Sequence, residues 1–342
     1  MDALEYLKKK TPELLNIPSP SGFTAAAAEF VVNELRGMGY EAGLTGKGCV
    51  LSCLGGEGEP LVLAAHIDTL GAMVAEVKSN GRLRLVPVGG LRAENTETEN
   101  FTVFTRFGGK KYTGCFQLCD PSVHVNGNYA DDKRNFDGME LVLDELTSSK
   151  EETEALGISV GDYACADPRT VMTESGFIKS RFLDDKLSVV ILLALAKKIR
   201  EEGLLLKRKV YVYITVYEEV GHGCSAGLPE DAEEIISVDM GCVGSSVSCL
   251  ETQVSICAKD SSGPSDYGVT SALIRTAKEN GIDYAVDVYP HYGSDADAAI
   301  RAGHDIRHCI VGSGVYASHG YERTHLKGVE ATLELLRRYV CR

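Results

Sequence analysis

Hydrophobic and polar positions along this chain fall into two textures. Near both ends, apolar runs of strand length alternate with segments of helical periodicity, whereas the middle has short alternating stretches broken by Gly, Asn and Asp. The first texture is typical of a mainly parallel sheet covered by helices, and the second of a small β-barrel. We therefore predict an α/β core made of residues 1–69 and 177–342, interrupted by an inserted β-rich, barrel-like domain at 70–176.

The same patterns predict the individual elements. Beyond an amphipathic N-terminal helix that ends in a Pro/Ser turn, helices are expected at 23–38, 181–203, 265–280, 294–302 and 328–339. Strands are expected at 49–54, 61–65, 210–217, 234–238, 284–288 and 308–311. Within the inserted segment we predict one helix, at 137–147. No internal repeat interrupts this order.

Composition narrows the possible partners. The chain has 342 residues, with 35 basic and 49 acidic side chains and a formal charge of −14. Such a balance argues against a broad nucleic-acid footprint and against docking on anionic lipid. No apolar stretch reaches the length of a membrane span, and the N-terminus lacks the apolar region of a signal peptide. We expect neither nucleic acid nor membrane as a partner.

Cysteine usage indicates the compartment. The eleven cysteines are odd in number, form no CxxC pair and lie mostly inside apolar runs. Reduced thiols that pack as small hydrophobic side chains explain this distribution. We therefore predict a cytoplasmic protein.

The strand expected at 210–217 is followed by two adjacent carboxylates, Glu218 and Glu219. Burying uncompensated carboxylates costs several kcal/mol, so such a pair needs cations or shared protons. Other expected core elements also carry ligand-type residues at their ends. The full set is His66, Asp68, Asp184, Asp185, Glu218, Glu219, Asp239 and His319. Because sites in open α/β sheets form at the carboxyl ends of the strands, we predict that these side chains converge at one edge.

This set favours metal chemistry. It is rich in carboxylates and contains no thiolate, which suits a hydrolytic pair of divalent ions (zinc, cobalt or manganese) better than a structural zinc site. Three ligand carboxylates and a bridging hydroxide would balance two divalent cations. In the His66-Ile-Asp68 sequence, the carboxylate is expected to hold the second ring nitrogen of the imidazole.

Together these motifs resemble a known family. The segments AHIDTLG (65–71), FLDDK (182–186), EEVG (218–221) and SVDMG (237–241), followed by a late histidine, are similar to the dinuclear metallo-aminopeptidases of the tetrahedral (TET) and glutamyl-aminopeptidase type. The segments at 16–22 and 156–168 also resemble this family, so the likeness covers essentially the whole chain. The β-rich insertion between the first histidine and the Asp pair distinguishes this group from other co-catalytic zinc exopeptidases.

The resemblance implies a zinc-exopeptidase core and a role for each residue. Asp184 would bridge two metal ions, with His66 and Asp239 completing one site and Glu219 and His319 the other. Glu218 would be the general base, and Asp68 would orient His66. The implied activity is a metal-dependent aminopeptidase that removes N-terminal residues from peptides through a metal-bridging hydroxide. The inserted domain would build dimers, and these would assemble into a hollow dodecamer.

Three positions depart from the family pattern. Thr69 stands where the family commonly has Glu, and Lys186 replaces the Arg that usually follows the Asp pair. The late histidine lies in ASHGYERTH, which leaves His325 as a rival ligand. We favour His319 because it lies nearer the end of the preceding strand.

Two other functions are alternatives for this sequence. Paired carboxylates also serve glycoside hydrolysis, and some relatives have carried an endoglucanase label. The two histidines have no role in that chemistry. A non-catalytic assembly protein is the other alternative, although a decayed site would have lost some of its ligands. The preferred N-terminal residue of the substrate stays open.

Overall fold

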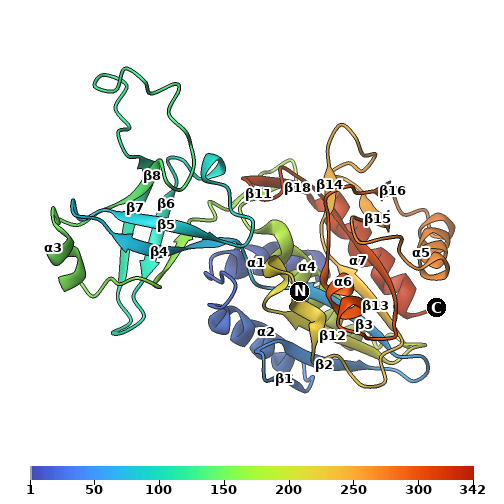
Figure 1. The fold of residues 1–342 in the computed structure, drawn as a ribbon. Coiled ribbons are helices and arrows are strands. Elements are labelled where there is room, and N and C mark those ends of the chain that lie inside the picture. Colours follow the sequence, from blue (N-terminus) through green and yellow to red (C-terminus); the bar gives the residue numbers. More distant parts are fainter. Residues whose placement is uncertain (1) are drawn as a thin grey trace. The chain divides into compact units, whose positions relative to one another are not determined.

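A computed structural model describes residues 2–342, which form two compact units. The first unit consists of the chain up to Asp68 together with Arg169–Arg342, and the second is Thr69–Pro168 (Figure 1). The first unit has the α/β texture, and the second is β-rich. Among the described residues, no helix is long and apolar enough to cross a membrane.

The first unit is built on a twelve-stranded sheet with a parallel centre. The four central strands run in the order β12 (Val210–Thr215), β3 (Leu61–His66), β13 (Glu234–Val238) and β17 (Arg307–Tyr316). The other strands are β1 (Ala42–Leu44), β2 (Val50–Gly55), β10 (Val171–Met172), β11 (Phe177–Ser180), β14 (Gly241–Val243), β15 (Val254–Lys259), β16 (Tyr284–Val288) and β18 (Glu322–His325). Every residue of β3 and β13 is buried, as expected for strands covered on both faces.

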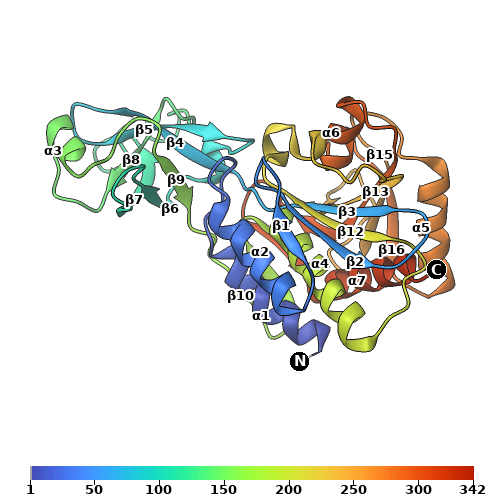
Figure 2. The same ribbon diagram turned by 90° about the horizontal axis from the view of Figure 1, so that it is seen from below.

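Helices cover both faces of these central strands. They are α1 (Ala3–Leu15), α2 (Ala25–Gly37), α4 (Leu183–Glu202), α5 (Tyr267–Glu279), α6 (Asp295–Arg301) and α7 (Leu326–Val340). Figure 2 shows α4 and α7 on one face of β3 and α6 on the other. The first half of α4 is buried on all sides because it lies between the sheet, α1 and α7. Its uniformly apolar sequence, Leu187–Ala196 apart from one serine, follows from that position.

The second unit is a closed six-stranded barrel in the order β4-β5-β8-β7-β6-β9. Its strands are β4 (Gly71–Val77), β5 (Leu83–Val88), β6 (Asn100–Phe104), β7 (Lys111–Leu118), β8 (Met139–Leu143) and β9 (Tyr163–Ala166). Its short helices are η1 (Ala93–Asn95) and α3 (Lys150–Ala155). Inside the barrel, the rings of Phe101 and Phe116 lie 5.6 Å apart and are fully buried. Closure removes the free edges that its alternating strands would otherwise expose.

The prediction of a helix at 137–147 is wrong. Met139–Leu143 is the strand β8, which pairs with β7 along its whole length and with β5 at one position. The apolar spacing of this segment fits a helix, but pairing with two strands closes the barrel and decides its conformation. Residues 169–176, which the sequence pattern assigned to the insertion, lie in the first unit, where β10 pairs with β11.

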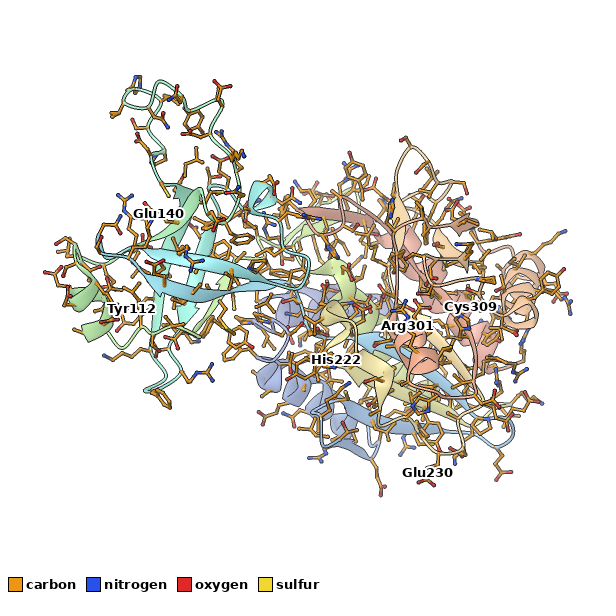
Figure 3. The ribbon with its side chains drawn as sticks, viewed as in Figure 1. Tyr112, Glu140, His222, Glu230, Arg301 and Cys309 are labelled. Atoms are coloured by element: carbon orange, nitrogen blue, oxygen red, sulfur yellow. The ribbon has the colours of Figure 1, made fainter. Side chains whose placement is uncertain are left out.

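Glu140 on β8 is a deeply buried acidic side chain of the barrel unit (Figure 3). It is 1% exposed, and its carboxylate accepts hydrogen bonds from Arg82 and, at 2.7 Å, from Lys78. Burial alone would raise the pKa of Glu140, but the two cations outweigh it and lower that pKa below its usual value. A buried carboxylate in this protein can therefore be neutralised by its own chain.

Candidate active site

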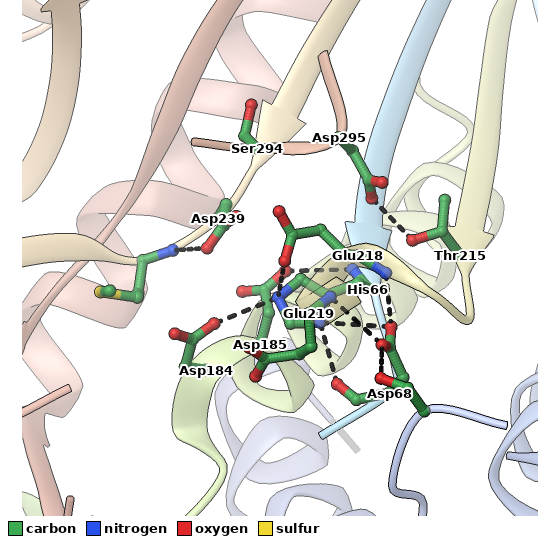
Figure 4. A network of polar contacts seen from close by, with 12 residues as sticks. His66, Asp68, Asp184, Asp185, Thr215, Glu218, Glu219, Asp239, Ser294 and Asp295 are labelled. Carbon is green, nitrogen blue, oxygen red and sulfur yellow. Dashed lines mark hydrogen bonds and ion pairs between the residues drawn. The ribbon is translucent and has the colours of Figure 1, made fainter. Parts of the chain in front are cut away.

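The carboxyl ends of the parallel strands deliver most of the predicted site residues to one place (Figure 4). His66 is the last residue of β3 and lies beside Thr215, the last residue of β12. Asp239 follows the last residue of β13 directly. Glu218 and Glu219 begin a 3-10 turn, η2 (Glu218–Val220), three residues after β12 ends. The apolar strands thus place these residues, as their sequence predicted.

Two further residues arrive from other elements. Asp184 lies in the first turn of α4 and is joined to Asp185 by a cis peptide bond. His319 lies in the loop between β17 and β18. Helix, loop and strand ends together bring all five predicted ligands into one region.

The donor atoms form two groups that share one carboxylate. His66, Asp184 and Asp239 make the first group, and the second is Asp184, Glu219 and His319, with the ligand atoms of each group within 4.8 Å of one another. Oδ1 of Asp184 lies 3.1 Å from Nε2 of His66, and its Oδ2 lies 3.4 Å from Nε2 of His319. The two oxygens of Asp184 therefore face two different histidines.

The site gathers several buried acidic side chains, and their pKa values are shifted from the usual range. Burial, reinforced by neighbouring carboxylates, raises the pKa of Glu218 and of Glu219 well above the usual value, and it raises that of Asp239 to about 7. Burial also acts on Asp184, but there the contacts with His319 and His66 prevail and hold the pKa below its usual range. Burial opposes the charged form of His66, yet its acidic neighbours raise its pKa well above normal. Such a set is stabilised by added positive charge.

The donors fit divalent metal ions. Oε1 of Glu219 is buried and has no hydrogen-bond partner among the described residues. Buried polar atoms are almost always paired, so an unpaired carboxylate oxygen in a cluster of acids fits the role of a metal ligand. Imidazole nitrogens combined with carboxylate oxygens are ligands typical of zinc, cobalt and manganese sites.

Asp68 is fully buried and contacts His66 differently from the expectation. Nδ1 of His66 lies 2.9 Å from the backbone carbonyl oxygen of Asp68 and 3.6 Å from its carboxylate. The carboxylate instead accepts the N–H groups of Glu218 and Glu219, at 3.1 and 3.3 Å, and the hydroxyl of Ser21. Asp68 therefore orients the imidazole through its main chain and holds the Glu218–Glu219 turn through its side chain.

Two buried carboxylates beside the site were missing from the predicted set. Asp295 accepts hydrogen bonds from the Thr215 hydroxyl at 2.7 Å and the Cys224 N–H at 2.9 Å, so it brackets the segment that carries Glu218 and Glu219. Glu322 accepts from the N–H groups of Asp184 and His319. Burial and the charge of Asp184 raise the pKa of Glu322 to about 8. Their positions in sequence, in a helix start and a short strand, gave no signal of these contacts.

The three positions that depart from the family pattern make the following contacts in the structure. Nδ1 of His325 accepts the N–H of Lys327 at the start of α7, and its Nε2 lies 2.9 Å from the carbonyl oxygen of Ser175, so His325 belongs to neither group. Lys186 is buried and donates to the carbonyl of Ile17. The Thr69 hydroxyl donates to the carbonyl of Leu70.

Comparison with known proteins identifies aminopeptidases as relatives of this chain. Residues 48–335 match the M42 glutamyl aminopeptidase family. YhfE of Bacillus subtilis (strain 168), whose name assigns it provisionally to the aminopeptidases, is 42% identical over 330 residues, which are 96% of this chain and 95% of YhfE. The lysyl aminopeptidase of Pyrococcus furiosus is 26% identical over 218 residues, 64% of this chain and 60% of its own.

A solved structure of the Pyrococcus horikoshii TET1 peptidase shares the fold, with a TM-score of 0.86 and 22% identity over 98% of this chain and 99% of its own. The match to the family covers most of the chain and includes every residue of the two donor groups. The chain belongs to the M42 glutamyl aminopeptidase family, and it is an aminopeptidase that hydrolyses peptide bonds.

Proposed function

We propose that this aminopeptidase holds two divalent metal ions per chain, one in each donor group, with Asp184 shared between them. The observation that carries the proposal is the placement of Asp184, whose two oxygens face His66 and His319. Asp239 completes the first group and Glu219 the second. Zinc is the expected metal, with cobalt or manganese as substitutes, because all three accept imidazole and carboxylate ligands.

We assign the proton transfer to Glu218. Two such metals, when bound, lower the pKa of a water molecule and polarise a substrate carbonyl. Glu218 belongs to neither donor group, and its Oε2 lies 3.7 Å from Nε2 of His66. Its raised pKa suits a group that takes a proton from water and gives it to the leaving amine nitrogen. Asp68 supports this role by holding the backbone of Glu218.

The substrates are peptides with a free N-terminus. A buried region rich in carboxylates favours the positively charged α-ammonium group of such peptides. N-blocked peptides lack that charge and are expected to be poor substrates. The related P. furiosus enzyme is named a lysyl aminopeptidase, but low identity over part of the chain does not extend its preference to this protein.

We further propose that the protein is a homo-oligomer of the cytoplasm, at least a dimer, and that dimers assemble into a dodecamer. One solved relative is described as a dodecamer, and the P. horikoshii peptidase as able to form a tetrahedron or a large octahedral shell. The barrel unit at 69–168 is the proposed assembly domain. All eleven cysteines are free thiols, which fits a reducing compartment. Light scattering should give a mass well above the 36.8 kDa of one chain, and a monomer would refute the assembly.

A panel of paired peptides tests the activity. Each peptide is offered with a free and with an acetylated N-terminus to protein supplied with zinc, cobalt or manganese, and the released amino acids are identified. We expect removal of single N-terminal residues from the free peptides alone. Equal cleavage of the acetylated peptides, or cleavage at internal bonds, would contradict an aminopeptidase that recognises the α-amine.

A further inference from the structure

Glu322 connects two ligand segments that lie far apart in the sequence. It is the first residue of β18 and stands opposite Ser180 of β11 in the antiparallel ladder. From there Oε2 accepts the N–H of Asp184 at 3.1 Å, and Oε1 accepts the N–H of His319 at 3.0 Å. The residue is 2% exposed. One buried carboxylate therefore holds the main chain of two residues from the second donor group.

The Asp184 N–H needs such an acceptor. Phe182, the N-cap residue of α4, is in the left-handed region with φ of 68°, and its side chain gives the helix no capping hydrogen bond. The first N–H groups of a helix have no partner within the helix. Asp184 itself has non-helical dihedrals, with ψ of 103°, and Glu322 supplies the acceptor for its N–H group.

The loop that carries His319 also needs support. Ala317 and His319 have φ of 59° and 63°, in a region that is costly for residues other than glycine. The guanidinium of the buried Arg181 donates to the carbonyl of Gly320 at 3.3 Å, and Glu322 accepts the His319 N–H. These two contacts hold the strained loop from its buried side.

The two donor groups differ in how firmly they are held. His66 and Asp239 stand at the ends of buried strands and are 1% and 4% exposed. The side chain of His319 is 40% exposed and stands on a strained loop. The second group therefore depends most on contacts that fix its backbone.

We infer that Glu322 is a positioning residue that fixes the main chains of Asp184 and His319 and so sets the metal affinity of the Asp184–Glu219–His319 group. The inference rests on the proposed two-metal function. Both oxygens of Glu322 accept main-chain N–H groups, whereas glutamine offers one acceptor and one NH₂ group. Glu322→Gln therefore places a donor against one of the two N–H groups. Glu322→Asp keeps the carboxyl group but is one methylene shorter.

Cobalt titration tests this role. Metal-stripped parent, Glu322→Gln and Glu322→Asp are titrated with Co²⁺, following the visible absorption of the bound ion and competition with a chelating dye. The matched control is Glu234→Gln, which removes a buried carboxylate from the start of β13. We expect both Glu322 variants to bind the second equivalent about 10–100-fold more weakly with an altered absorption, and the first equivalent with a smaller loss, because Asp184 belongs to both groups. Excess cobalt should restore much of their activity.

Two results distinguish a failure of the inference about Glu322 from a failure of the two-metal proposal. A second equivalent bound by both Glu322 variants with the affinity and absorption of the parent would overturn this inference alone, as would the same weakening in Glu234→Gln. A parent protein that binds only one ion would overturn the two-metal proposal and this inference with it. Circular dichroism checks folding, and Glu322→Asp, which retains the carboxyl group, replaces the glutamine variant if that variant does not fold.

Discussion

One strand of this protein has a buried carboxylate at each of its ends, and the two have opposite surroundings. Glu234 begins β13 and is 3% exposed, and its Oε1 accepts hydrogen bonds from Arg208 and Tyr339, each at 2.6 Å. Asp239 follows the other end and is 4% exposed, but its charged neighbours are mainly acids. The first carboxylate is neutralised within the chain, as Glu140 is in the barrel. The second belongs to a set that requires cations from outside.

The comparison shows how the same residue type serves stability at one edge of the sheet and chemistry at the other. An arginine at the carboxyl edge would neutralise the acids and leave no place for a metal ion. Histidines take that place at this edge, since neutral imidazole binds divalent metals and a protonated ring releases its proton when a metal binds.

The largest effect is expected from substituting Glu218, and its neighbour Glu219 should respond differently. Glu218→Gln should lower turnover by about 10²–10⁴-fold with the metal content intact, because it removes the proton carrier and no ligand. Glu219→Gln should instead lose metal from the second group. Turnover at saturating metal and elemental analysis of both variants check this. Equal metal loss in the two variants would show that the two roles are reversed.

Substitutions at the two ends of β13 test whether its two carboxylates differ in their contribution to the free energy of unfolding. In metal-stripped protein near pH 8, Glu234→Gln should lower the free energy of unfolding by about 3 kcal/mol, because it leaves the Arg208 guanidinium buried beside a neutral group. Asp239→Asn should not lower it, since it removes a buried charge whose neighbours are mainly acids. Urea unfolding of the two variants measures both values. Similar losses would mean that Asp239 is as well neutralised as Glu234.

A smaller effect is expected from pH. The folded protein raises the pKa of Asp239 from 3.8 to about 7, so between those values the folded state holds a proton that the unfolded state has released. The stability of metal-stripped protein should therefore fall as pH rises from about 4 to about 7, and Asp239→Asn should reduce that slope. Saturating zinc should abolish this dependence of stability on pH. Melting temperatures measured between about pH 4 and pH 7 check the prediction, and a melting temperature of the stripped parent that does not change with pH would count against a raised pKa of Asp239.

Parts of the site that depend on regular elements were predictable from the sequence. His66, Glu218, Glu219 and Asp239 end or follow apolar strands, and the parallel order brings those ends together. The parallel-sheet core and the barrel-like insertion follow from the same alternation of apolar positions. Their roles as ligands and base stay predictions until metal content and turnover are measured.

Parts that depend on tertiary contacts were not predictable. Glu322 lies in a four-residue strand whose sequence, ERTH, has no distinct alternation, and its partners are 138 and 3 positions away. The carboxylate of Asp68 accepts hydrogen bonds from main-chain N–H groups. Every residue except proline has such a group, so the sequence does not indicate which of them Asp68 contacts. The sequence pattern at 137–147 predicts a helix, but pairing within the barrel, and not local spacing, decides the form of β8.

Metal stoichiometry tests the central claim most directly. The protein is stripped with chelator, dialysed to equilibrium against micromolar zinc, and its metal content is measured by elemental analysis against chain concentration. Two ions per chain are expected for the parent, and one for Glu219→Gln, since the acidic edge is completed by cations from outside. A parent that binds no more than one ion, even at excess zinc, would contradict the account.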